Sequence, residues 1–264
     1  MIKLITCDID GTLLKGYADP IQPELFDLIE KFYEKNVLFF AASGRQLYNL
    51  QKIFEPVGDK IGYIAENGAI VLYNNKMLYK SAIDVDLAKR LSKKILDKDN
   101  LELFISGEHT TYIMPKSKDF DKLIGNEIQN NITLIKSFDE IDQDIVKVSL
   151  FNEGGVNEEI VQYFVKDFGD KFQHTVSGHT WYDFMNLDTH KGNAIRLLQK
   201  VINVSSDETV AFGDNFNDIE MLSDAKYSYA MEDAHEDVKK VANYTCKDVI
   251  ETLKEIYNKF FSEG

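Results

Sequence analysis

Two pairs of aspartates in this sequence each follow a run of apolar residues. Asp8 and Asp10 come directly after the apolar N-terminus, and Asp214 and Asp218 come after the apolar run 209–212. If these side chains meet, two carboxylates about 4 Å apart repel each other by ~4 kcal/mol at an effective dielectric constant of ~20. Such a cluster requires raised pKa values or a bound cation. A small set of oxygen ligands suits Mg²⁺, which retains water and readily accepts a phosphate oxygen.

A serine and a lysine would supply the hydroxyl group and the positive charge that carboxylates lack. Ser43 and Gly44 follow the apolar run 37–42 and offer a hydroxyl group and a backbone N–H group that a ligand can approach closely. Lys191 begins a helix predicted over 191–201, and a helix N-terminus favours anions. Acids, a divalent cation, a lysine and a hydroxyl group together describe a site for phosphoryl transfer, which depends on positioning and charge neutralisation.

Strands and helices that alternate at the two ends of the chain would position these side chains. Near-continuous apolar runs predict buried parallel strands at 2–7, 37–42, 61–65 and 209–212. Helical periodicity predicts helices at 23–32, 46–54, 191–201, 218–223 and 248–261. This alternation predicts right-handed crossovers and a parallel sheet. Because ligands bind at the carboxyl ends of such strands, we expect the polar segments to form one site.

A different pattern occupies the middle of the chain. Asn74 and Asn75 separate two short strand-like runs, which predicts a hairpin. Beyond it, adjacent strands without intervening helices predict an antiparallel sheet with helices on one face. The predicted strands are 101–106, 110–114, 132–137, 145–151, 171–177 and 180–186, and the predicted helices are 85–98, 117–129 and 157–168. We therefore expect an α/β fold: a Rossmann-like parallel sheet core built from 1–82 and 183–264, with an inserted α+β domain over 83–182.

Composition and charge exclude several classes of protein. With 264 residues, 44% of them hydrophobic and 28% charged, the chain has an ordinary globular balance and room for one or two domains. The formal net charge of −14 disfavours nucleic acid and anionic membranes as partners, because both bind positive charge. Two distant cysteines, Cys7 and Cys246, indicate neither a disulfide framework nor a zinc site. Since no signal-peptide core and no membrane-spanning run is evident, we expect a soluble, cytoplasmic protein.

Four segments resemble, in the same order, the four motifs of the haloacid dehalogenase (HAD) superfamily of phosphohydrolases. These segments are 8–14 (DIDGTLL), 43–45 (SGR), 191–192 (KG) and 213–218 (GDNFND). Residues 66–69 (ENGA) and the long insertion resemble the Cof-type subfamily, which carries a large α/β cap of the C2B type. The resemblance implies that residues 83–182 form this cap.

The resemblance also implies a phosphatase that acts on small phosphorylated metabolites, such as sugar phosphates or phosphorylated cofactors, through an aspartyl-phosphate intermediate. Asp8 would be the nucleophile, and Asp10 would act first as general acid and then as base. Asp8, the backbone carbonyl of Asp10, and Asp214 would bind Mg²⁺, with Asp218 binding it through water or orienting the other ligands. The phosphate would be held by Ser43, Gly44, Lys191, Asn217 and the backbone of Ile9.

Three further residues are assigned to substrate specificity, namely Arg45, Glu66 and Asn67. Arg45 is open to two interpretations, contact with the substrate or an ion pair with an acid of the cap. Glu66 and Asn67 follow the third predicted strand and are expected at the mouth of the site. The cap would close over the site, select the leaving group and exclude bulk water.

Two alternative functions are compatible with the same residues. A phosphomutase would return the phosphoryl group from the aspartate to a sugar instead of to water. A phospho-signalling receiver also gathers acids, a hydroxyl group and a lysine around Mg²⁺. The second acid of the Asp-x-Asp pair and the large insertion argue against the receiver.

Overall fold

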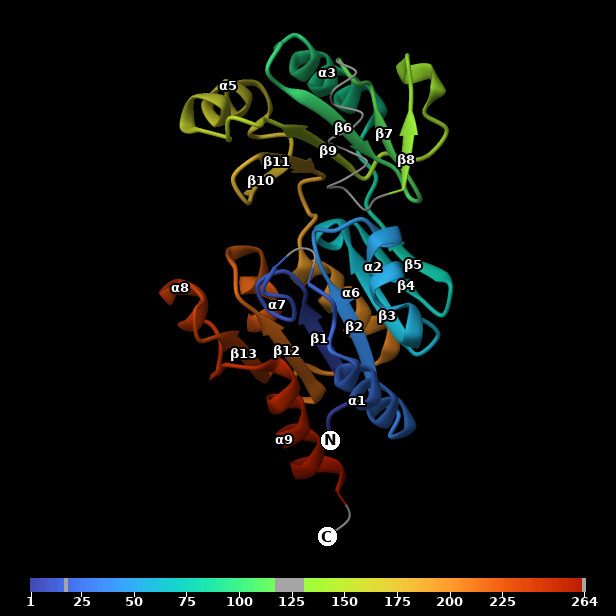
Figure 1. Ribbon diagram of the computed structural model, residues 1–264, viewed down its shortest axis with the longest axis vertical. Helices are drawn as coiled ribbons and strands as arrows, with labels where there is room; N and C mark the ends of the chain where they lie inside the picture. The colour runs from blue at the N-terminus through green and yellow to red at the C-terminus, as the bar shows by residue number, and fades with distance from the viewer. Residues whose placement is uncertain (17–18, 117–130, 263–264) are drawn as a thin grey trace. The chain divides into compact units, whose positions relative to one another are not determined.

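The computed structural model describes residues 1–16, 19–116 and 131–262 (Figure 1). The chain folds into two compact units. The first consists of Met1–Arg45, Leu50–Tyr79 and His190–Gly264, and the second of Gln46–Asn49 and Lys80–Thr189. The two ends of the sequence therefore form one unit, and the middle of the sequence forms the other.

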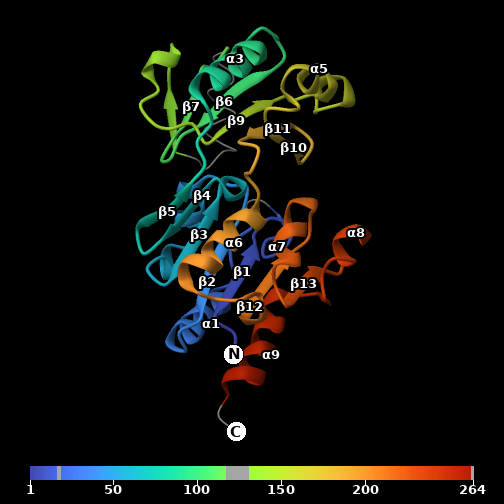
Figure 2. The same cartoon turned by 180° about the vertical axis from the view of Figure 1, so that it is seen from behind.

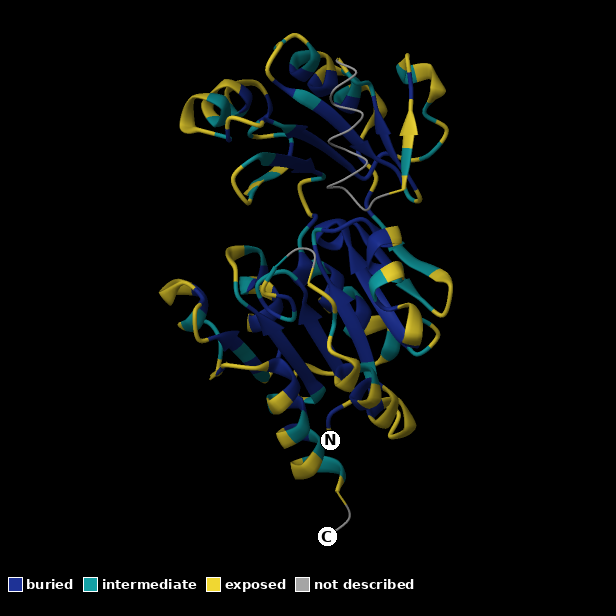
Figure 3. Ribbon diagram, viewed as in Figure 1, coloured by how far each residue is buried: buried dark blue, intermediate teal, exposed yellow. Residues whose placement is uncertain are grey.

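An eight-stranded sheet lies at the centre of the first unit, with the strand order β14-β13-β12-β1-β2-β3-β4-β5. Its strands are β1 (Leu4–Asp8), β2 (Leu38–Ala42), β3 (Ile61–Ala65), β4 (Ile70–Tyr73), β5 (Lys76–Lys80), β12 (Thr209–Gly213), β13 (Tyr227–Met231) and β14 (Tyr244–Cys246). The strands from β14 to β3 pair in parallel, and β3 pairs with β4 in antiparallel fashion. β1, β3 and β12 are buried along their whole length (Figure 3), which explains their continuous apolar sequences.

Helices cover both faces of this sheet (Figures 1 and 2). They are α1 (Pro23–Glu34), α2 (Leu47–Ile53), α6 (Lys191–Ile202), α7 (Ile219–Ser223) and α9 (Val249–Phe261), and the short α8 (Glu236–Lys239) lies beside β13. α1 packs on α9, with the rings of Phe32 and Tyr257 5.3 Å apart between centroids, and α6 packs on α7. Within the described ranges, no helix is both long enough and apolar enough to cross a membrane.

The predicted hairpin joins β4 to β5 at the edge of the sheet. Its two turn residues, Asn74 and Asn75, have φ values of 49° and 56°. Two consecutive positive φ angles are typical of the type I′ turn, which matches the twist of the strands that it connects. The sequence signal at Asn74-Asn75 is thus confirmed.

The second unit is built on a six-stranded sheet with the order β10-β11-β9-β6-β7-β8. Its strands are β6 (Glu102–Ser106), β7 (Thr111–Ile113), β8 (Ile132–Leu134), β9 (Lys147–Phe151), β10 (Gln173–Ser177) and β11 (Trp181–Met185). Two helices, α3 (Val85–Leu96) and α5 (Glu158–Phe168), contribute Leu91 and Phe164 to a core shared with Tyr182 of the sheet. All six predicted strands and two of the three predicted helices are present. The predicted helix 117–129 lies outside the described residues.

One strand pair in this sheet departs from the expected antiparallel arrangement. β8 pairs with β7 in parallel, with Thr111 opposite Ile132. A parallel pair cannot be closed by a hairpin and requires a crossover of a dozen or more residues. The chain between Ile113 and Ile132 is long enough for that connection.

The chain enters and leaves the second unit at neighbouring points. Thr189 Oγ1 donates a hydrogen bond to Ser81 Oγ (3.1 Å), and Asn186 Nδ2 donates one to the carbonyl of Ala82 (3.3 Å). The predicted domain boundary after residue 182 cuts β11, which pairs with β9 as far as Met185. The second unit therefore continues to Thr189, beyond the predicted range 83–182.

Candidate active site

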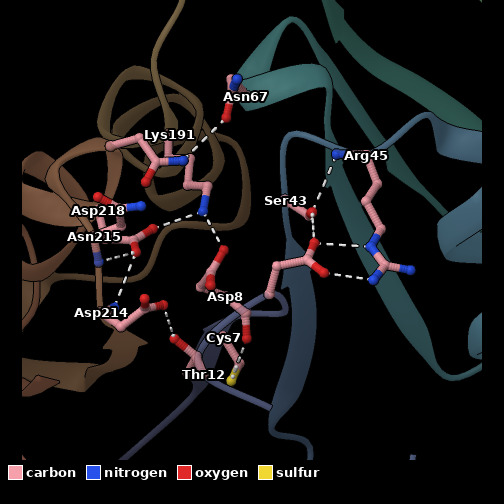
Figure 4. Close-up of polar contacts among 12 residues, drawn as sticks. Cys7, Asp8, Thr12, Ser43, Arg45, Asn67, Lys191, Asp214, Asn215 and Asp218 are labelled. Atoms are coloured by element: carbon pink, nitrogen blue, oxygen red, sulfur yellow. Dashed lines mark hydrogen bonds and ion pairs between the residues drawn. The ribbon is translucent and has the colours of Figure 1, made fainter. Parts of the chain in front are cut away.

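Three neighbouring strands of the first unit end in the loops that carry most of the candidate residues. They lie in the order β12-β1-β2 and run parallel. Their carboxyl ends therefore share one edge of the sheet, which is where parallel α/β sheets bind ligands. Asp8 ends β1, Ser43 follows β2 and Asp214 follows β12. Figure 4 shows the side chains from these loops gathered around Asp8.

Lys191, the first residue of α6, lies buried between two carboxylates. Its Nζ donates to Asp8 Oδ1 and to Asp218 Oδ1, the latter at 2.6 Å (Figure 4). The side chains of Lys191 and Asp218 have no exposed surface, and that of Asp8 is 7% exposed. Because a buried charge is costly unless it is paired, the three groups hold one another in place.

The second oxygen of Asp218 organises the loop after β12. Asp218 Oδ2 accepts hydrogen bonds from the backbone N–H groups of Asp214 and Asn215, each at 3.1 Å. A Cβ atom at Gly213 would lie 2.5 Å from the Cβ of Asp218, so this close approach requires glycine. Asp218 thereby fixes Lys191 with one oxygen and the backbone of Asp214 with the other.

The carboxylate of Asp214 is held by the loop after β1. Thr12 Oγ1 donates to Asp214 Oδ1 at 2.7 Å (Figure 4). Gly11 has a φ of +92°, and a Cβ atom there would lie 2.3 Å from Asp214 Oδ2. Only glycine both adopts this φ without strain and leaves room for the carboxylate. Thr12 was given no role from the sequence, although it lies within the first motif.

The negatively charged groups of this cluster outnumber the positively charged ones, and their pKa values are shifted. Burial raises the pKa of Asp8 well above its ordinary value, Asp218 raises it further, and Lys191 opposes them. Burial also raises the pKa of Asp214, against the opposing effect of the hydrogen bond from Thr12. Burial lowers the pKa of Lys191, but Asp218 and Asp8 outweigh it, and the net shift is upward. Three carboxylates thus share one ammonium group, which leaves an excess of negative charge.

The same three carboxylates fit a divalent cation. One oxygen from each of Asp8, Asp214 and Asp218 lies within 4.8 Å of the other two. Opposite oxygens in an octahedral Mg²⁺ site are about 4.2 Å apart, so small side-chain movements suffice. The hard oxygen donors suit Mg²⁺, and the cation would cancel the excess charge. The carboxylate of Asp10 lies outside this trio and pairs with Arg45 instead.

Asp10 and Arg45 form a two-pronged ion pair on the other side of Asp8. Arg45 Nε donates to Asp10 Oδ2 at 2.8 Å, and Arg45 Nη2 donates to Asp10 Oδ1 at 2.5 Å. Ser43 Oγ donates to Asp10 Oδ2 at 3.4 Å and accepts from the backbone N–H of Arg45 at 3.1 Å. The sequence left Arg45 between a contact with substrate and an ion pair with an acid of the inserted domain. The acid at its side is Asp10, in the first unit.

The loop Glu66–Gly68 after β3 clamps the loop after β2. The N–H of Glu66 donates to the carbonyl of Arg45, and the N–H of Asn67 donates to the carbonyl of Ser43, both at 3.0 Å. Glu66, Asn67 and Gly68 have φ values of 50°, 57° and 100°, a run of left-handed backbone that is costly for the two residues with a side chain. Such strain persists only where the surrounding structure over-determines it.

Asn67 also reaches the loop after β12. Its Oδ1 accepts a hydrogen bond from Asn217 Nδ2 at 3.2 Å. A Cβ atom at Gly44 would lie 3.0 Å from the same Oδ1, so Gly44 permits this approach. Asn67, predicted at the mouth of the site, is buried among the loops of Ser43, Gly44 and Asn217, and Glu66 is buried beside it. The assignment of Ser43, Gly44, Asn217, Lys191 and Ile9 to phosphate binding stays a prediction.

Comparison with known proteins assigns the chain to a family. Residues 5–252 match the haloacid dehalogenase-like hydrolase family. The chain therefore belongs to this family of hydrolases, and the family resemblance found in the four motifs is confirmed. It is an enzyme, and two of the relatives described below are named as phosphatases.

Individual relatives cover nearly the whole chain. The 5-amino-6-(5-phospho-D-ribitylamino)uracil phosphatase YbjI of Escherichia coli is 28% identical over 92% of this chain and 90% of its own length. A solved structure from Eubacterium rectale is 28% identical, with a TM-score of 0.88 over 97% of this chain and 99% of that one. The HAD subclass IIB sugar phosphatase BT4131 shares the fold, with a TM-score of 0.79 over 96% of this chain and 98% of its own, at 24% identity.

Proposed function

We propose that the protein is a Mg²⁺-dependent phosphatase that releases inorganic phosphate from small phosphorylated metabolites by way of a phosphorylated Asp8. The observation that carries this proposal is the position of Asp8, which ends a buried strand against Lys191 and shares a cation-sized cluster with Asp214 and Asp218. A carboxylate in this setting is fixed in direction and close to positive charge. Both features favour attack on a phosphorus atom.

Each group has a distinct part in the proposed reaction. Asp8 attacks phosphorus, while Asp10 gives a proton to the leaving oxygen and later takes one from the attacking water. Lys191 neutralises the charge of Asp8 and the phosphoryl oxygens, and Ser43 and Asn217 offer hydrogen-bond donors to those oxygens. Asp8 and Asp214, with the backbone carbonyl of Asp10, would hold Mg²⁺, which supplies charge neutralisation at the phosphoryl group. Asp218 would orient Lys191 and the backbone of Asp214.

The proposed class of substrate is supported by the names of the relatives. YbjI is named for a substrate in which a phosphate is carried by a ribityl chain attached to a uracil ring. We propose a substrate of comparable size, a phosphate ester of a sugar, a sugar alcohol or a cofactor precursor. The net charge of −14 accords with a small substrate and disfavours nucleic acid.

Release of phosphate from p-nitrophenyl phosphate and from a panel of sugar and sugar-alcohol phosphates tests the proposal. We expect activity that requires Mg²⁺, disappears with EDTA, and falls by on the order of 10³-fold or more in Asp8→Asn. Asp207→Asn is a matched control, because this aspartate is 72% exposed and pairs only at the surface with Lys226. Activity that survives EDTA or Asp8→Asn would contradict the mechanism. Isomerisation of a hexose phosphate without phosphate release would favour a mutase.

A further inference from the structure

Arg45 and Asp10 differ in how far they are exposed, although they form one ion pair. The side chain of Arg45 is 5% exposed, whereas that of Asp10 is 40% exposed. A guanidinium group held out of water in this way requires a partner that satisfies its planar array of donors. Arg45 is thus the fixed member of the pair, and Asp10 is the member that solvent or a substrate can reach.

The backbone on both sides of the pair is fixed by hydrogen bonds. The carbonyl of Arg45 accepts from the N–H of Glu66, and its own N–H donates to Ser43 Oγ. In the loop of Asp10, the N–H of Gly11 donates to the carbonyl of Leu14 at 2.7 Å. The remaining freedom of Asp10 is therefore the rotation of its side chain. Arg45 restricts that rotation, because its Nε and Nη2 atoms bind the two carboxylate oxygens separately.

This restriction matters for proton transfer. In the proposed reaction, the bond between phosphorus and the leaving oxygen breaks as the bond from Asp8 to phosphorus forms. The leaving oxygen keeps the electron pair and takes the proton of Asp10, so that Asp10 becomes a carboxylate. The guanidinium group is already in place where that negative charge develops, which is the condition for stabilising a transition state.

We propose that Arg45 is a positioning residue that aims Asp10 at the leaving oxygen and stabilises its carboxylate as the proton departs. The assignment rests on the proposed phosphatase function and replaces a direct role of Arg45 in substrate specificity. This role predicts a specific dependence of the rate on the leaving group. The importance of Arg45 must grow as the leaving group becomes more basic, because an acidic phenol departs without a proton and a weakly acidic one does not.

The experiment measures kcat/KM for a series of substituted phenyl phosphates, ordered by the pKa of the phenol released. All of these substrates share a phenyl phosphate core, so their recognition varies little, and kcat/KM reports the step in which the phenol leaves. In Arg45→Gln we expect a decrease of on the order of 10²-fold for the least acidic phenol and little change for the most acidic, within the range of general acid catalysis. Arg45→Lys keeps the charge without the two-pronged geometry and should recover part of the loss.

A double-mutant cycle with Asp10→Asn supplies the second readout. If Arg45 acts through Asp10, Arg45→Gln should cost almost nothing further in the Asp10→Asn background. Arg196→Gln is the control, because Arg196 is 46% exposed and pairs with Asp224 at the surface. Equal losses across the whole series, or full additivity with Asp10→Asn, would overturn the proposal. A wild-type protein without phosphatase activity would instead refute the proposed function itself.

Discussion

Lys191 and Asp218 form an ion pair of 2.6 Å in which neither side chain has any surface exposed to solvent. Lys191 also donates to Asp8, and Asp218 also accepts two backbone N–H groups. Removal of either partner would therefore leave buried charge without compensation. The candidate site is at the same time a concentration of charge that the fold must stabilise.

Lys191→Met should destabilise the protein strongly. Breaking a buried ion pair on one side costs about 3–5 kcal/mol, because Asp8 and Asp218 would remain close together without their ammonium partner. The free energy of unfolding in urea, measured in EDTA, tests this expectation. Lys254→Met is the control, since Lys254 pairs with Glu24 and Glu251 on the surface and should cost less than about 1 kcal/mol. Similar losses in both variants would contradict this account.

Asp8→Asn should stabilise the protein in the absence of Mg²⁺. Burial raises the folded-state pKa of Asp8, with Asp218 adding to the shift, so the folded protein binds more protons at this group than the unfolded chain does. Stability from this group is therefore lost as pH rises above the unfolded pKa of about 3.9 and through the folded value. In EDTA we expect a higher Tm for Asp8→Asn at pH 8 and a smaller difference at pH 5. A lower Tm at pH 8 would refute the prediction.

Addition of Mg²⁺ should raise the Tm of the wild type more than that of Asp8→Asn. A ligand that binds only the folded state stabilises it by an amount that grows with its affinity, and the asparagine variant lacks one of the two carboxylates, Asp8 and Asp214, proposed to bind Mg²⁺. Thermal scans over a range of Mg²⁺ concentrations provide the measurement. Equal shifts in the two proteins would indicate that Mg²⁺ binds elsewhere.

Gly11→Ala should weaken metal binding beyond its cost in stability. Both Gly11 and Gly178 have positive φ, but a Cβ atom at Gly178 would meet nothing within 4 Å, whereas at Gly11 it would displace Asp214. Gly178→Ala thus measures the backbone strain alone, about 1–2 kcal/mol. Gly11→Ala should cost more and should raise the Mg²⁺ concentration needed for half-maximal activity by roughly tenfold or more. Equal losses of stability and equal Mg²⁺ requirements in the two variants would contradict this explanation.

Two substitutions of Asn67 distinguish the effect of its backbone strain from the effect of its side-chain hydrogen bond. Asn67→Gly removes the amide that binds Asn217 but relieves the φ of 57°, and Asn67→Ala removes the amide and keeps the strain. We expect similar increases in KM, about fivefold for one lost hydrogen bond, in both variants. Asn67→Gly should be the more stable by about 1 kcal/mol. An unchanged KM in both variants would show that the amide has no part in binding.

Much of the fold could be predicted because most of its strands have clear apolar or alternating patterns. β1 and β12 are buried along their whole length and are mostly apolar, and the strands of the second unit show alternation or short apolar runs. β13 was missed because Tyr227–Met231 mixes polar and aromatic residues. β14 was missed because it has three residues, two of them exposed. Neither gives a periodic signal of sufficient length.

Less of the site could be predicted, because the sequence motifs do not determine the direction in which each side chain points. The meeting of Asp8, Asp214 and Asp218 follows from strands that end at one edge of the sheet. The pairing of Arg45 with Asp10 depends on a rotamer and on the loop that holds Arg45, so the sequence left its partner open. The bond between Asn67 and Asn217 likewise depends on left-handed backbone, for which asparagine is only one of several candidates.

The hydrogen bond between Ser81 and Thr189 has a consequence for how such proteins diversify. Because Ser81 and Thr189 lie within hydrogen-bonding distance, the polypeptide between these two residues forms an inserted module whose two ends lie together. Such a module can be lengthened, shortened or exchanged by recombination while the order and pairing of the strands that bear Asp8 and Asp214 stay the same. The recognition of new molecules can then change while the reacting groups are inherited intact.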